Sequence, residues 1–317
     1  MNLHESILNA EKVIREHLRL TPTEHSPFLS NQTDAEVFLK LENFQVTGSF
    51  KARGAINKLS SLTDEEKAIG VITASSGNHG LGVASGAKKL GIQSTVYVPE
   101  YADPSKIQAI ELEGAEVKFV GDDCVITESA ARKDAERSGE VYISPYNDLD
   151  VIAGQGTIGV ELLQQLDSID AVFVSVGGGG LISGIGAYLK KASPRTEIVA
   201  CSPSQSPAMH ACMEAKKTID VPCYPTLSDA TAGGVEEGAI TLDLCCTHVD
   251  QSILVEEEEI KAAMLTLMNQ HHMLIEGAAG VAVAAFLKAQ EDYQGKKVAI
   301  LICGANIGIE KLRSVLS

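Results

Sequence analysis

A lysine near the start of the chain stands in a setting that can make its amine a nucleophile. Lys51 follows Phe50 and the small residues Gly48 and Ser49, and an apolar helical segment comes directly after it. A lysine held in a partly apolar pocket has a lowered pKa, and its neutral amine can form a Schiff base. Because most isolated lysines are solvated surface residues, this interpretation depends on what other motifs contribute.

A run of four glycines offers a site for an anion. The segment Ser175-Val176-Gly177-Gly178-Gly179-Gly180-Leu181 follows a predicted strand and opens a predicted helix. Consecutive glycines let the backbone approach a ligand closely, and the free N–H groups at a helix start attract negative charge. We therefore predict a phosphate site, because a tight turn alone would need only one glycine. No Lys-Ser/Thr pair follows, so the segment is not a nucleoside-triphosphate loop.

A second loop between a strand and a helix is rich in polar side chains. Thr73-Ala74-Ser75-Ser76-Gly77-Asn78-His79-Gly80 contains hydroxyl, amide and imidazole groups. Together with the N–H groups of the following helix, they suit a carboxylate. A helix cap alone would need one serine, so the whole loop favours a binding function. His79 taken alone is more often a structural partner than a base.

A third glycine pattern has two competing interpretations. Gly154-Gln155-Gly156-Thr157-Ile158-Gly159 matches G-x-G-x-x-G, the fingerprint of dinucleotide binding. That fingerprint requires a strand directly before it, whereas residues 145–150 form a polar turn. The alternative is that these glycines let a helix pack closely against its neighbours. The same pattern is the basis for the alternative that the protein is a nucleotide-binding or regulatory protein.

The elements that position these motifs alternate regularly along the chain. The predicted strands are Gly70–Ala74, Ser94–Val98, Glu116–Val120, Val141–Ser144, Ala171–Val176, Glu197–Cys201 and Val298–Cys303. The predicted helices are His79–Leu90, Pro104–Leu112, Thr127–Arg137, Val151–Leu166, Leu181–Lys191 and Ile309–Val315. This alternation predicts βαβ units and mainly parallel sheets that are covered on both faces.

Composition excludes several classes of protein. The 317 residues carry 26 basic and 42 acidic side chains, a net charge of −16, which disfavours nucleic acid and anionic membrane surfaces as partners. No apolar run approaches the roughly 18 residues of a membrane span. The seven cysteines include no C-x-x-C pair, and the first residues show no signal-peptide pattern. We therefore expect a reduced, cytoplasmic protein.

In order along the chain, the motifs resemble those of fold-type II pyridoxal-phosphate enzymes, specifically the serine/threonine dehydratase and serine racemase branch. The resemblance rests on the lysine motif Ser49–Ala55, the substrate loop Ser75–Gly80, the segment Val151–Thr157, the phosphate loop Ser175–Leu181 and the segment Cys303–Asn306. These five motifs cover nearly the whole chain. The resemblance accounts for the G-x-G-x-x-G pattern, because Val151–Thr157 is typical of this branch.

The resemblance implies a fold and a domain organisation. We expect an α/β protein with two open twisted, mainly parallel sheets flanked by helices, similar to the tryptophan synthase β subunit, with the cofactor between the domains. Residues 1–69 and 147–317 would form a large cofactor-binding domain, and residues 70–146 a small mobile domain that closes on the substrate. We also expect a homodimer.

The resemblance also implies a role for each motif residue. Lys51 would carry pyridoxal 5'-phosphate covalently and remove the Cα proton, and Ser76 would be the second catalytic residue. The cofactor-binding residues would be Phe50, Lys51, Asn78, Gly177, Gly178, Gly179, Gly180, Leu181, Glu276 and Cys303. The substrate-binding residues would be Ser75, Ser76, Asn78 and His79. We expect Thr226–Val235 to line the pocket or the cofactor rim.

The implied activity is a dehydratase, or ammonia-lyase, that converts serine- or threonine-like β-hydroxy amino acids to 2-oxo acids and ammonia. Cys303 would face the pyridine nitrogen and leave it unprotonated, which favours β-elimination. The alternative is an amino-acid (serine) racemase, in which Ser76 returns a proton to the face opposite Lys51; one enzyme could do both. The preferred side chain, whether of serine, threonine, or a bulkier or acidic analogue, stays open.

Two departures from the family pattern carry further expectations. The family's divalent-cation site uses acidic residues after the strand that is Glu197–Cys201 here, whereas Ser202–Ala208 contains no carboxylate. We therefore expect no divalent metal there, although a potassium-like ion would suit such ligands. The chain ends soon after Asn306, so we expect no C-terminal regulatory domain of the kind found in biosynthetic threonine dehydratases.

Overall fold

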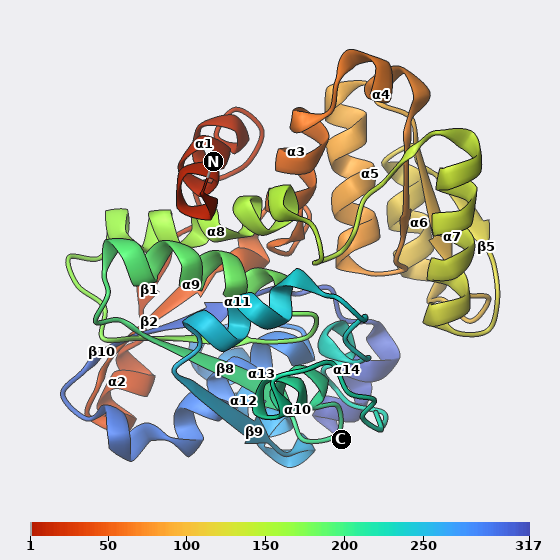
Figure 1. Ribbon diagram of the computed structural model, residues 1–317. Coiled ribbons are helices and arrows are strands. Elements are labelled where there is room, and N and C mark those ends of the chain that lie inside the picture. The colour runs from red at the N-terminus through yellow and green to blue at the C-terminus, as the bar shows by residue number, and fades with distance from the viewer. Residues whose placement is uncertain (1) are drawn as a thin grey trace.

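The computed structural model describes residues 2–317, and its strands form two separate sheets (Figure 1). The large sheet has the order β1 (Thr23–His25), β2 (Glu36–Leu41), β10 (Lys297–Ile302), β7 (Ala171–Ser175), β8 (Glu197–Pro203) and β9 (Gln251–Val255). The small sheet has the order β5 (Glu116–Phe119), β4 (Ser94–Val98), β3 (Val71–Ala74) and β6 (Val141–Tyr142). Neighbouring strands are parallel except β1 and β2. The predicted fold class is confirmed; Met1, the first residue of the predicted large domain, lies outside the described residues.

Helices flank both sheets. They are α1 (Leu3–Ile14), α2 (Pro27–Thr33), α3 (Lys51–Ser61), α4 (Asp64–Ile69), α5 (Asn78–Leu90), α6 (Pro104–Leu112), α7 (Cys124–Ser138), α8 (Leu149–Gln165), α9 (Gly180–Ala192), α10 (Ala208–Ala215), α11 (Ile240–His248), α12 (Glu257–His271), α13 (Gly277–Lys288) and α14 (Ile309–Leu316). Short 3-10 turns are η1 (Glu42–Phe44), η2 (Asp229–Thr231) and η3 (Gln290–Tyr293). The six predicted helices correspond to α5, α6, α7, α8, α9 and α14.

The seven predicted strands are present, and the structure adds three more. The added strands β1, β2 and β9 all lie in the large sheet, β1 and β9 at its two edges. In β2 the apolar run is interrupted by Lys40, which is fully buried because its ammonium pairs with the carboxylate of Glu161 at 2.5 Å. A charged residue within a strand interrupts the apolar pattern from which strands are predicted, so β2 was not predicted.

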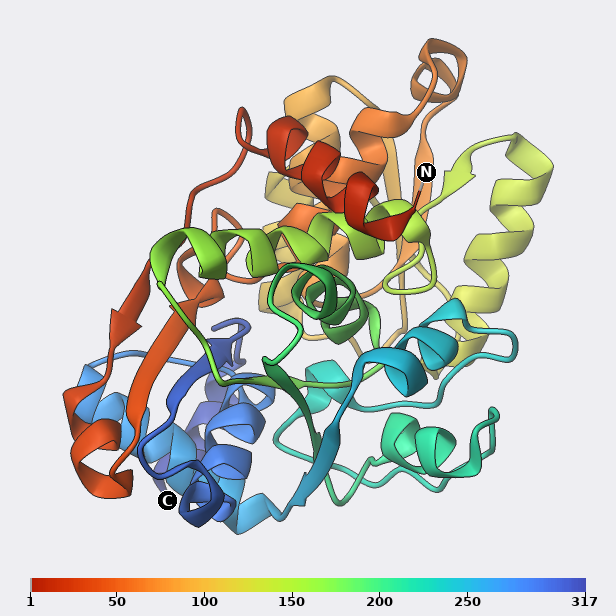
Figure 2. The same cartoon turned by 60° about the vertical axis from the view of Figure 1, so that its left-hand side comes forward.

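The large sheet is the centre of the main hydrophobic core. Helices α8 and α9 pack against each other on one face of the sheet, and α12 and α13 pack on the other (Figure 1). The residues of β7 are buried throughout, as are those of β10 after its first residue, because both faces are covered. Helix α1 crosses α8, so the N-terminal segment closes the outer side of this layer (Figure 2).

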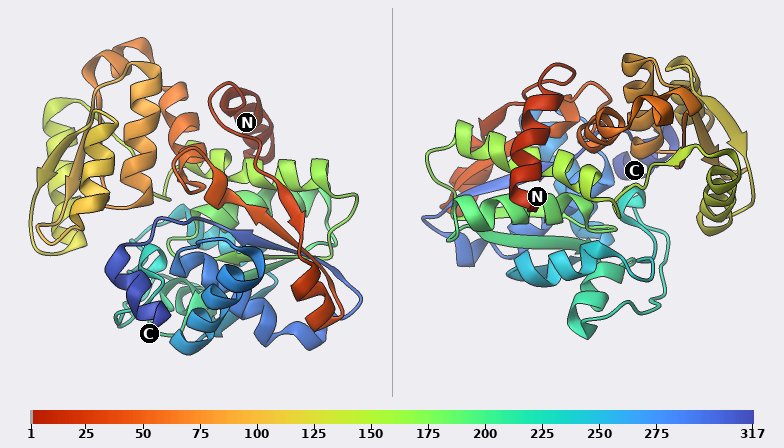
Figure 3. Two further views of the ribbon diagram at one scale, coloured as in Figure 1. Left: turned by 180° about the vertical axis from the view of Figure 1, so that it is seen from behind. Right: turned by 45° about the horizontal axis from the view of Figure 1, so that its top comes forward.

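The small sheet forms a lobe of its own with α5, α6 and α7, and this lobe lies beside the large sheet (Figure 3). Alternate residues of β3 face opposite ways, as the period of a strand requires. Val71 packs with Val83 of α5 and Leu59 of α3, whereas the next residue, Ile72, packs with Ala131 of α7. We call β3–β6 with α5, α6 and α7 the small lobe.

The functional loops all follow the carboxyl ends of parallel strands. Strand β3 ends at Ala74, β7 at Ser175 and β10 at Ile302. The polar loop, the glycine loop and Cys303 come directly after these ends. Ligands of open α/β sheets bind outside the carboxyl ends of the strands, so both sheets direct their loops toward the same space.

Candidate active site

One cleft of about 520 Å³ lies between the two sheets and gathers the site residues that the sequence predicted. It is lined by all of them: Phe50, Lys51, Ser75, Ser76, Asn78, His79, Gly177, Gly178, Gly179, Gly180, Leu181, Glu276 and Cys303. Residues 229–234 also line the cleft, as expected for the middle of Thr226–Val235. The structure therefore brings together, from both sheets, motifs that are more than 250 positions apart.

Four helices begin at this cleft. The residues before α3, α5, α9 and α13 are Phe50, Gly77, Gly179 and Glu276, and none of these four residues makes a side-chain capping hydrogen bond to its own helix. By contrast, Asp103, Asp123 and Asp148 cap α6, α7 and α8 with their side chains. Uncapped helix starts present free N–H groups and positive partial charge. The cleft is therefore suited to a ligand that carries more than one anionic group.

Lys51 is the first residue of α3, and its amine lies in the cleft. The Nζ donates a hydrogen bond to the carbonyl oxygen of Pro145 at 2.8 Å, and it lies 5.4 Å from the centre of the Phe50 ring. Surrounding atoms enclose the amine, although part of the side chain still faces the cleft. This burial lowers the pKa of Lys51 to about 8, against the opposing effects of Glu276 and Cys303. A neutral, nucleophilic amine is therefore accessible near physiological pH.

The glycine loop is held against other segments so closely that side chains would not fit. A Cβ on Gly178 would lie 2.4 Å from the ring of Tyr146, and one on Gly177 would lie 3.0 Å from the backbone of Thr231. Gly179 has φ of +86°, in the left-handed region that favours glycine. Protein packing and backbone conformation thus both require glycine here, and the backbone that they produce opens toward the cleft.

The polar loop is anchored by His79. Its Nε2 lies 3.0 Å from the carbonyl oxygen of Ile143, so this nitrogen carries the proton, and Nδ1 has no partner among the described residues. Burial, and then the charge of Lys51, lowers the pKa of His79 to about 3. The imidazole is therefore neutral and cannot supply a positive charge to a carboxylate. Ser75 and Ser76, both half-buried, present their side chains nearer to the opening.

A chain of hydrogen bonds joins three side chains from different parts of the sequence. The amide nitrogen of Asn78 donates to both carboxylate oxygens of Glu276 at 2.9 Å, and the amide of Asn306 donates to the oxygen of Asn78 at 2.6 Å. Burial raises the pKa of Glu276 to about 7, although the bonds from Asn78 oppose that rise. The position of the Asn78 amide is thus determined by Glu276 and Asn306.

Cys303 lies at the bottom of the cleft, directly after β10. Its Sγ accepts a hydrogen bond from the hydroxyl of Ser175 at 3.5 Å and lies 3.8 Å from a carboxylate oxygen of Glu276. Burial raises the pKa of the thiol well above its ordinary value, so Cys303 is neutral. Its carbonyl oxygen accepts the N–H of Phe50 at 3.0 Å, which ties the segment around Cys303 to the start of α3.

Three residues that shape the cleft have no predicted role. Asn306 lies inside a quoted motif, and its amide bonds both Asn78 and the carbonyl of Thr47. Pro145 and Tyr146 lie in the polar turn before α8, which was read only as evidence against a dinucleotide fingerprint. The one available signal was their position directly after a predicted strand, where site residues gather.

The glycines of the G-x-G-x-x-G pattern serve packing, as the alternative interpretation proposed. They lie inside α8, where a Cβ on Gly154 would lie 2.5 Å from the carbonyl oxygen of Arg53. A Cβ on Gly156 would lie 2.8 Å from the carbonyl oxygen of Gly184 in α9. These glycines let α8 approach α3 and α9 closely. The dinucleotide interpretation is therefore wrong.

Among residues 2–317, no group of three or more histidine, cysteine, aspartate or glutamate side chains is arranged to hold a metal ion. Within the same residues, no helix has both the length and the apolar character needed to cross a membrane.

The fold and the cleft define the class of protein. The sequence pattern of the family described as "Pyridoxal-phosphate dependent enzyme" matches residues 14–304, so this chain belongs to that family. The cleft fits the cofactor that gives the family its name. Its lining includes an amine that can react with an aldehyde (Lys51), a glycine loop of the kind that suits a phosphate (Gly177–Gly180) and a neutral thiol (Cys303).

The chain is similar to three named proteins. The chain is 40% identical over 313 residues to the L-threonine ammonia-lyase of Thermotoga maritima, covering 99% of this chain and 78% of that protein. Its structure is similar to processed threonine deaminase isoform 2 of Solanum lycopersicum, with a TM-score of 0.94, 31% identity, and 99% and 92% of the two chains covered. It is also similar to serine racemase of Dictyostelium discoideum, with a TM-score of 0.91, 33% identity, and 98% and 99% covered.

Proposed function

We propose that this protein is a pyridoxal-phosphate dependent dehydratase of serine- or threonine-like β-hydroxy amino acids, which releases a 2-oxo acid and ammonia. The observation that carries the proposal is the Lys51 amine, enclosed in one cleft with the Gly177–Gly180 loop and Cys303. The names of the relatives in Thermotoga maritima and Solanum lycopersicum, a threonine ammonia-lyase and a threonine deaminase, support the substrate class.

The cofactor would be held by groups from both sheets. Lys51 would carry it covalently, residues Gly177–Leu181 would bind its phosphate, Phe50 would flank its ring, and Asn78 with Glu276 would lie beside the ring. When bound, pyridoxal phosphate withdraws electrons from the amino acid and makes its Cα proton acidic. The neutral thiol of Cys303 would offer no negative charge to hold a proton on the ring nitrogen, which would favour loss of the β-hydroxyl.

The residues of the chain then have separate tasks. The uncapped start of α5, with the hydroxyls of Ser75 and Ser76, binds the substrate carboxylate. The amine of Lys51, held by the carbonyl of Pro145, removes the Cα proton. His79 stays neutral and orients the loop through its bond to Ile143. Loss of water across Cα and Cβ, followed by hydrolysis, gives the 2-oxo acid and ammonia.

A racemase is the second candidate. The observation that favours it is Ser76, a half-buried hydroxyl that lines the same cleft as Lys51. A hydroxyl on the opposite side of Cα could return a proton and invert the centre. The similarity to serine racemase of Dictyostelium discoideum supports this activity as an addition to the dehydratase. Chiral analysis of unreacted L-serine during turnover separates the two, because only a racemase produces D-serine.

The organisation of the protein is also part of the proposal. We infer a large domain of residues 1–69 and 147–317 and a mobile small domain of residues 70–146. Core clusters confined to the small lobe and to the large sheet support this division. One further cluster crosses the boundary, where Leu59 of α3 packs with Val71 and Val83 of the small lobe. The protein would act as a homodimer in the cytoplasm.

The test of the function is removal of the Lys51 amine. Lys51→Ala should lower 2-oxo acid formation from L-threonine and L-serine by at least about 10³-fold, because both the covalent attachment and the base are lost. Lys58→Ala, on the same helix but paired with Asp148, is the matched control and should keep its activity. Absorption near the visible edge, bleached by borohydride, should be present in wild type and in the control only.

Two results would contradict the proposal. One is near-wild-type turnover by a correctly folded Lys51→Ala protein. The other is borohydride fixation of the cofactor on a peptide that does not contain Lys51.

A further inference from the structure

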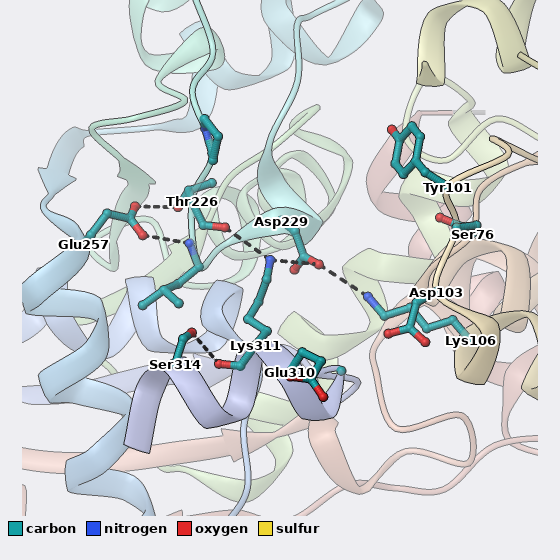
Figure 4. A pocket seen from close by; sticks show the side chains of 14 residues that line it. Ser76, Tyr101, Asp103, Lys106, Thr226, Asp229, Glu257, Glu310, Lys311 and Ser314 are labelled. Atoms are coloured by element: carbon teal, nitrogen blue, oxygen red, sulfur yellow. Dashed lines mark hydrogen bonds and ion pairs between the residues drawn. The ribbon is translucent and has the colours of Figure 1, made fainter. Parts of the chain in front are cut away.

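A second cavity, of about 570 Å³, adjoins the cleft on its solvent side. The cavity and the cleft share four lining residues, Ser76, Tyr101, Lys106 and Asp229. Its walls come from α6 and the preceding turn on one side, and from residues 225–229, Glu257 and α14 on the other (Figure 4). We call this cavity the vestibule. A molecule that crosses it arrives at Ser76, beside the loop that would bind a substrate carboxylate.

An ion bridge stands where the vestibule meets the cleft. The carboxylate of Asp229 lies 3.4 Å from the ammonium of Lys106 on α6 and 3.2 Å from that of Lys311 on α14 (Figure 4). Both ammonium groups contact the same oxygen, Oδ2. Lys106 belongs to the small lobe, whereas Asp229 and Lys311 pack with the large sheet. We call these three residues the Asp229 bridge.

The large-sheet side of this bridge is held firmly. Lys311 also donates to the carbonyl oxygen of Thr226 at 3.2 Å. The carboxylate of Glu257 accepts the Thr226 hydroxyl at 2.6 Å and the N–H of Leu227 at 2.7 Å. Asp229 also begins η2, whose last residue, Thr231, packs against the phosphate loop. The position of Asp229 is therefore set by the large sheet, and Lys106 is the partner free to move with the small lobe.

A second ion pair also joins the small lobe to the rest of the molecule. Arg132 of α7 pairs with Glu236 at 2.9 Å. Such contacts can break and re-form in water at little cost, because partly exposed ion pairs contribute about 1 kcal/mol or less. The side chains of Lys106 and Asp229 are 24% and 44% exposed, so water reaches them. These are the properties of a contact that opens and closes.

We propose that the vestibule is the entry route of the amino-acid substrate and that the Asp229 bridge is the gate that closes behind it. The inference rests on the proposed function, because it assumes an amino acid bound at Ser75–His79. The vestibule carries two ammonium groups among the carboxylates of Asp103, Asp229, Glu257 and Glu310. A zwitterionic amino acid carries one carboxylate and one ammonium group. Its carboxylate can pair with a lysine and its ammonium with an aspartate or glutamate, so it can replace the contacts of the Asp229 bridge while it passes.

Charge exchange across the gate tests the proposal. The variants of the holoenzyme are Lys106→Asp, Asp229→Lys and the double variant that exchanges the two charges. Each single variant should speed amide hydrogen exchange in α6 and in residues 226–234 without substrate, and should raise KM for L-threonine about two- to fivefold. The double variant should return both measurements toward wild type. Lys311→Met should also speed amide hydrogen exchange and raise KM, but by less than the single variants.

A matched control and a salt titration complete the experiment. Lys88 pairs with Glu113 at 3.5 Å entirely within the small lobe, so Lys88→Met removes a similar ion pair that crosses no opening. It should change neither measurement. Raising the salt from about 0.1 M to about 1 M shortens the screening length and should speed exchange in wild type, but not in Lys106→Met.

The outcomes separate the gate from the proposed function. The gate would be overturned if both single variants had the amide hydrogen exchange rates of wild type. It would also be overturned if the double variant did not recover the wild-type exchange rates. Failure to recover KM while exchange recovers would show that Lys106 binds substrate directly, which also overturns it. If no β-hydroxy amino acid is turned over but exchange follows the predicted pattern, the dehydratase proposal fails and the gate stands as a conformational device.

Discussion

Burial is what sets the protonation states in the cleft. It lowers the pKa of Lys51 to about 8 and that of His79 to about 3, and it raises that of Glu276 to about 7. It also raises the pKa of the Cys303 thiol. Each shift favours the neutral form, as expected when charge is moved out of water. The cleft therefore offers neutral groups around helix starts that attract anions.

The raised pKa of Glu276 predicts how stability depends on pH. Between the ordinary carboxyl value of 4.5 and about 7, the folded protein holds a proton that the unfolded chain has released. The free energy of unfolding therefore falls as the pH rises through this window, and it stays lower above it. Glu276→Gln removes this loss, so the cofactor-free variant should be more stable than wild type at pH 8 by on the order of 2–3 kcal/mol.

Urea unfolding of both cofactor-free proteins at pH 5 and pH 8 measures this effect. Near pH 5 the two proteins should differ little, because Glu276 is protonated in the fold and glutamine keeps the oxygen that accepts from Asn78. A variant that is equally or less stable than wild type at pH 8 would show that Glu276 is ionised in the folded protein.

At the scale of elements, the position of α3 decides where the Lys51 amine lies. Two residues after Lys51, the guanidinium of Arg53 is fully buried between Glu42 and Glu161, with N–O distances of 2.7 Å to each. Glu161 also pairs with Lys40 at 2.5 Å. These four buried charges join α3 to β2, η1 and α8. The Arg53 of the lysine motif thus holds the helix that presents the amine.

Removing Arg53 should be strongly destabilising. Arg53→Met removes the ion-pair partner of the buried Glu42 and one of the three partners of Glu161, and breaking a buried ion pair from one side costs about 3–5 kcal/mol. Arg53→Lys should recover only part of this loss, because one ammonium cannot bond two carboxylates in the geometry of the guanidinium fork. Urea or thermal unfolding measures the change.

An exposed arginine provides the control for this prediction. Arg313 pairs with Glu310 on α14, with 69% of its side chain exposed, and Arg313→Met should change stability by less than about 1 kcal/mol. An equally small change for Arg53→Met would mean that the buried charges are not needed to hold α3.

At the scale of the whole molecule, the cleft exists only where the two sheets meet. The small lobe supplies the polar loop and α5, whereas the large sheet supplies the glycine loop, Cys303 and Glu276. A cofactor bound here would contact both parts, and a ligand that binds only the folded protein stabilises it by mass action.

Pyridoxal phosphate should therefore raise the unfolding temperature of the cofactor-free protein. At about 100 times its Kd, a ligand adds about 2.7 kcal/mol, which corresponds to roughly 4 °C in a chain of this size. Gly178→Ala should weaken this stabilisation, because its Cβ would lie 2.4 Å from the Tyr146 ring and displace the loop. Thermal scans across a cofactor titration give the comparison; equal shifts in both proteins would contradict the role of this loop.

The motifs and the alternation of elements could be read from the sequence, because both depend on local chemistry. Consecutive glycines let the backbone approach a ligand closely, and β-branched runs favour strands. The alternation predicted parallel sheets, whereas the two-sheet fold and the set of residues around the cleft followed from the resemblance of the motifs to the family. Strand β2 could not be predicted from local sequence, because Lys40 is compatible with a buried strand only when Glu161, far along the chain, neutralises its charge.

Contacts between distant segments were decided by the tertiary structure alone. Asn306 bonds Asn78 across 228 positions, and Gly48, with φ of +72°, makes room for it, because a Cβ there would lie 2.7 Å from the Asn306 side chain. The Asp229 bridge likewise depends on how α6 and α14 approach one loop. Such pairings arise from packing in three dimensions. Local residue preferences determine which elements form, whereas packing determines which side chains meet and, through burial, which of them are charged.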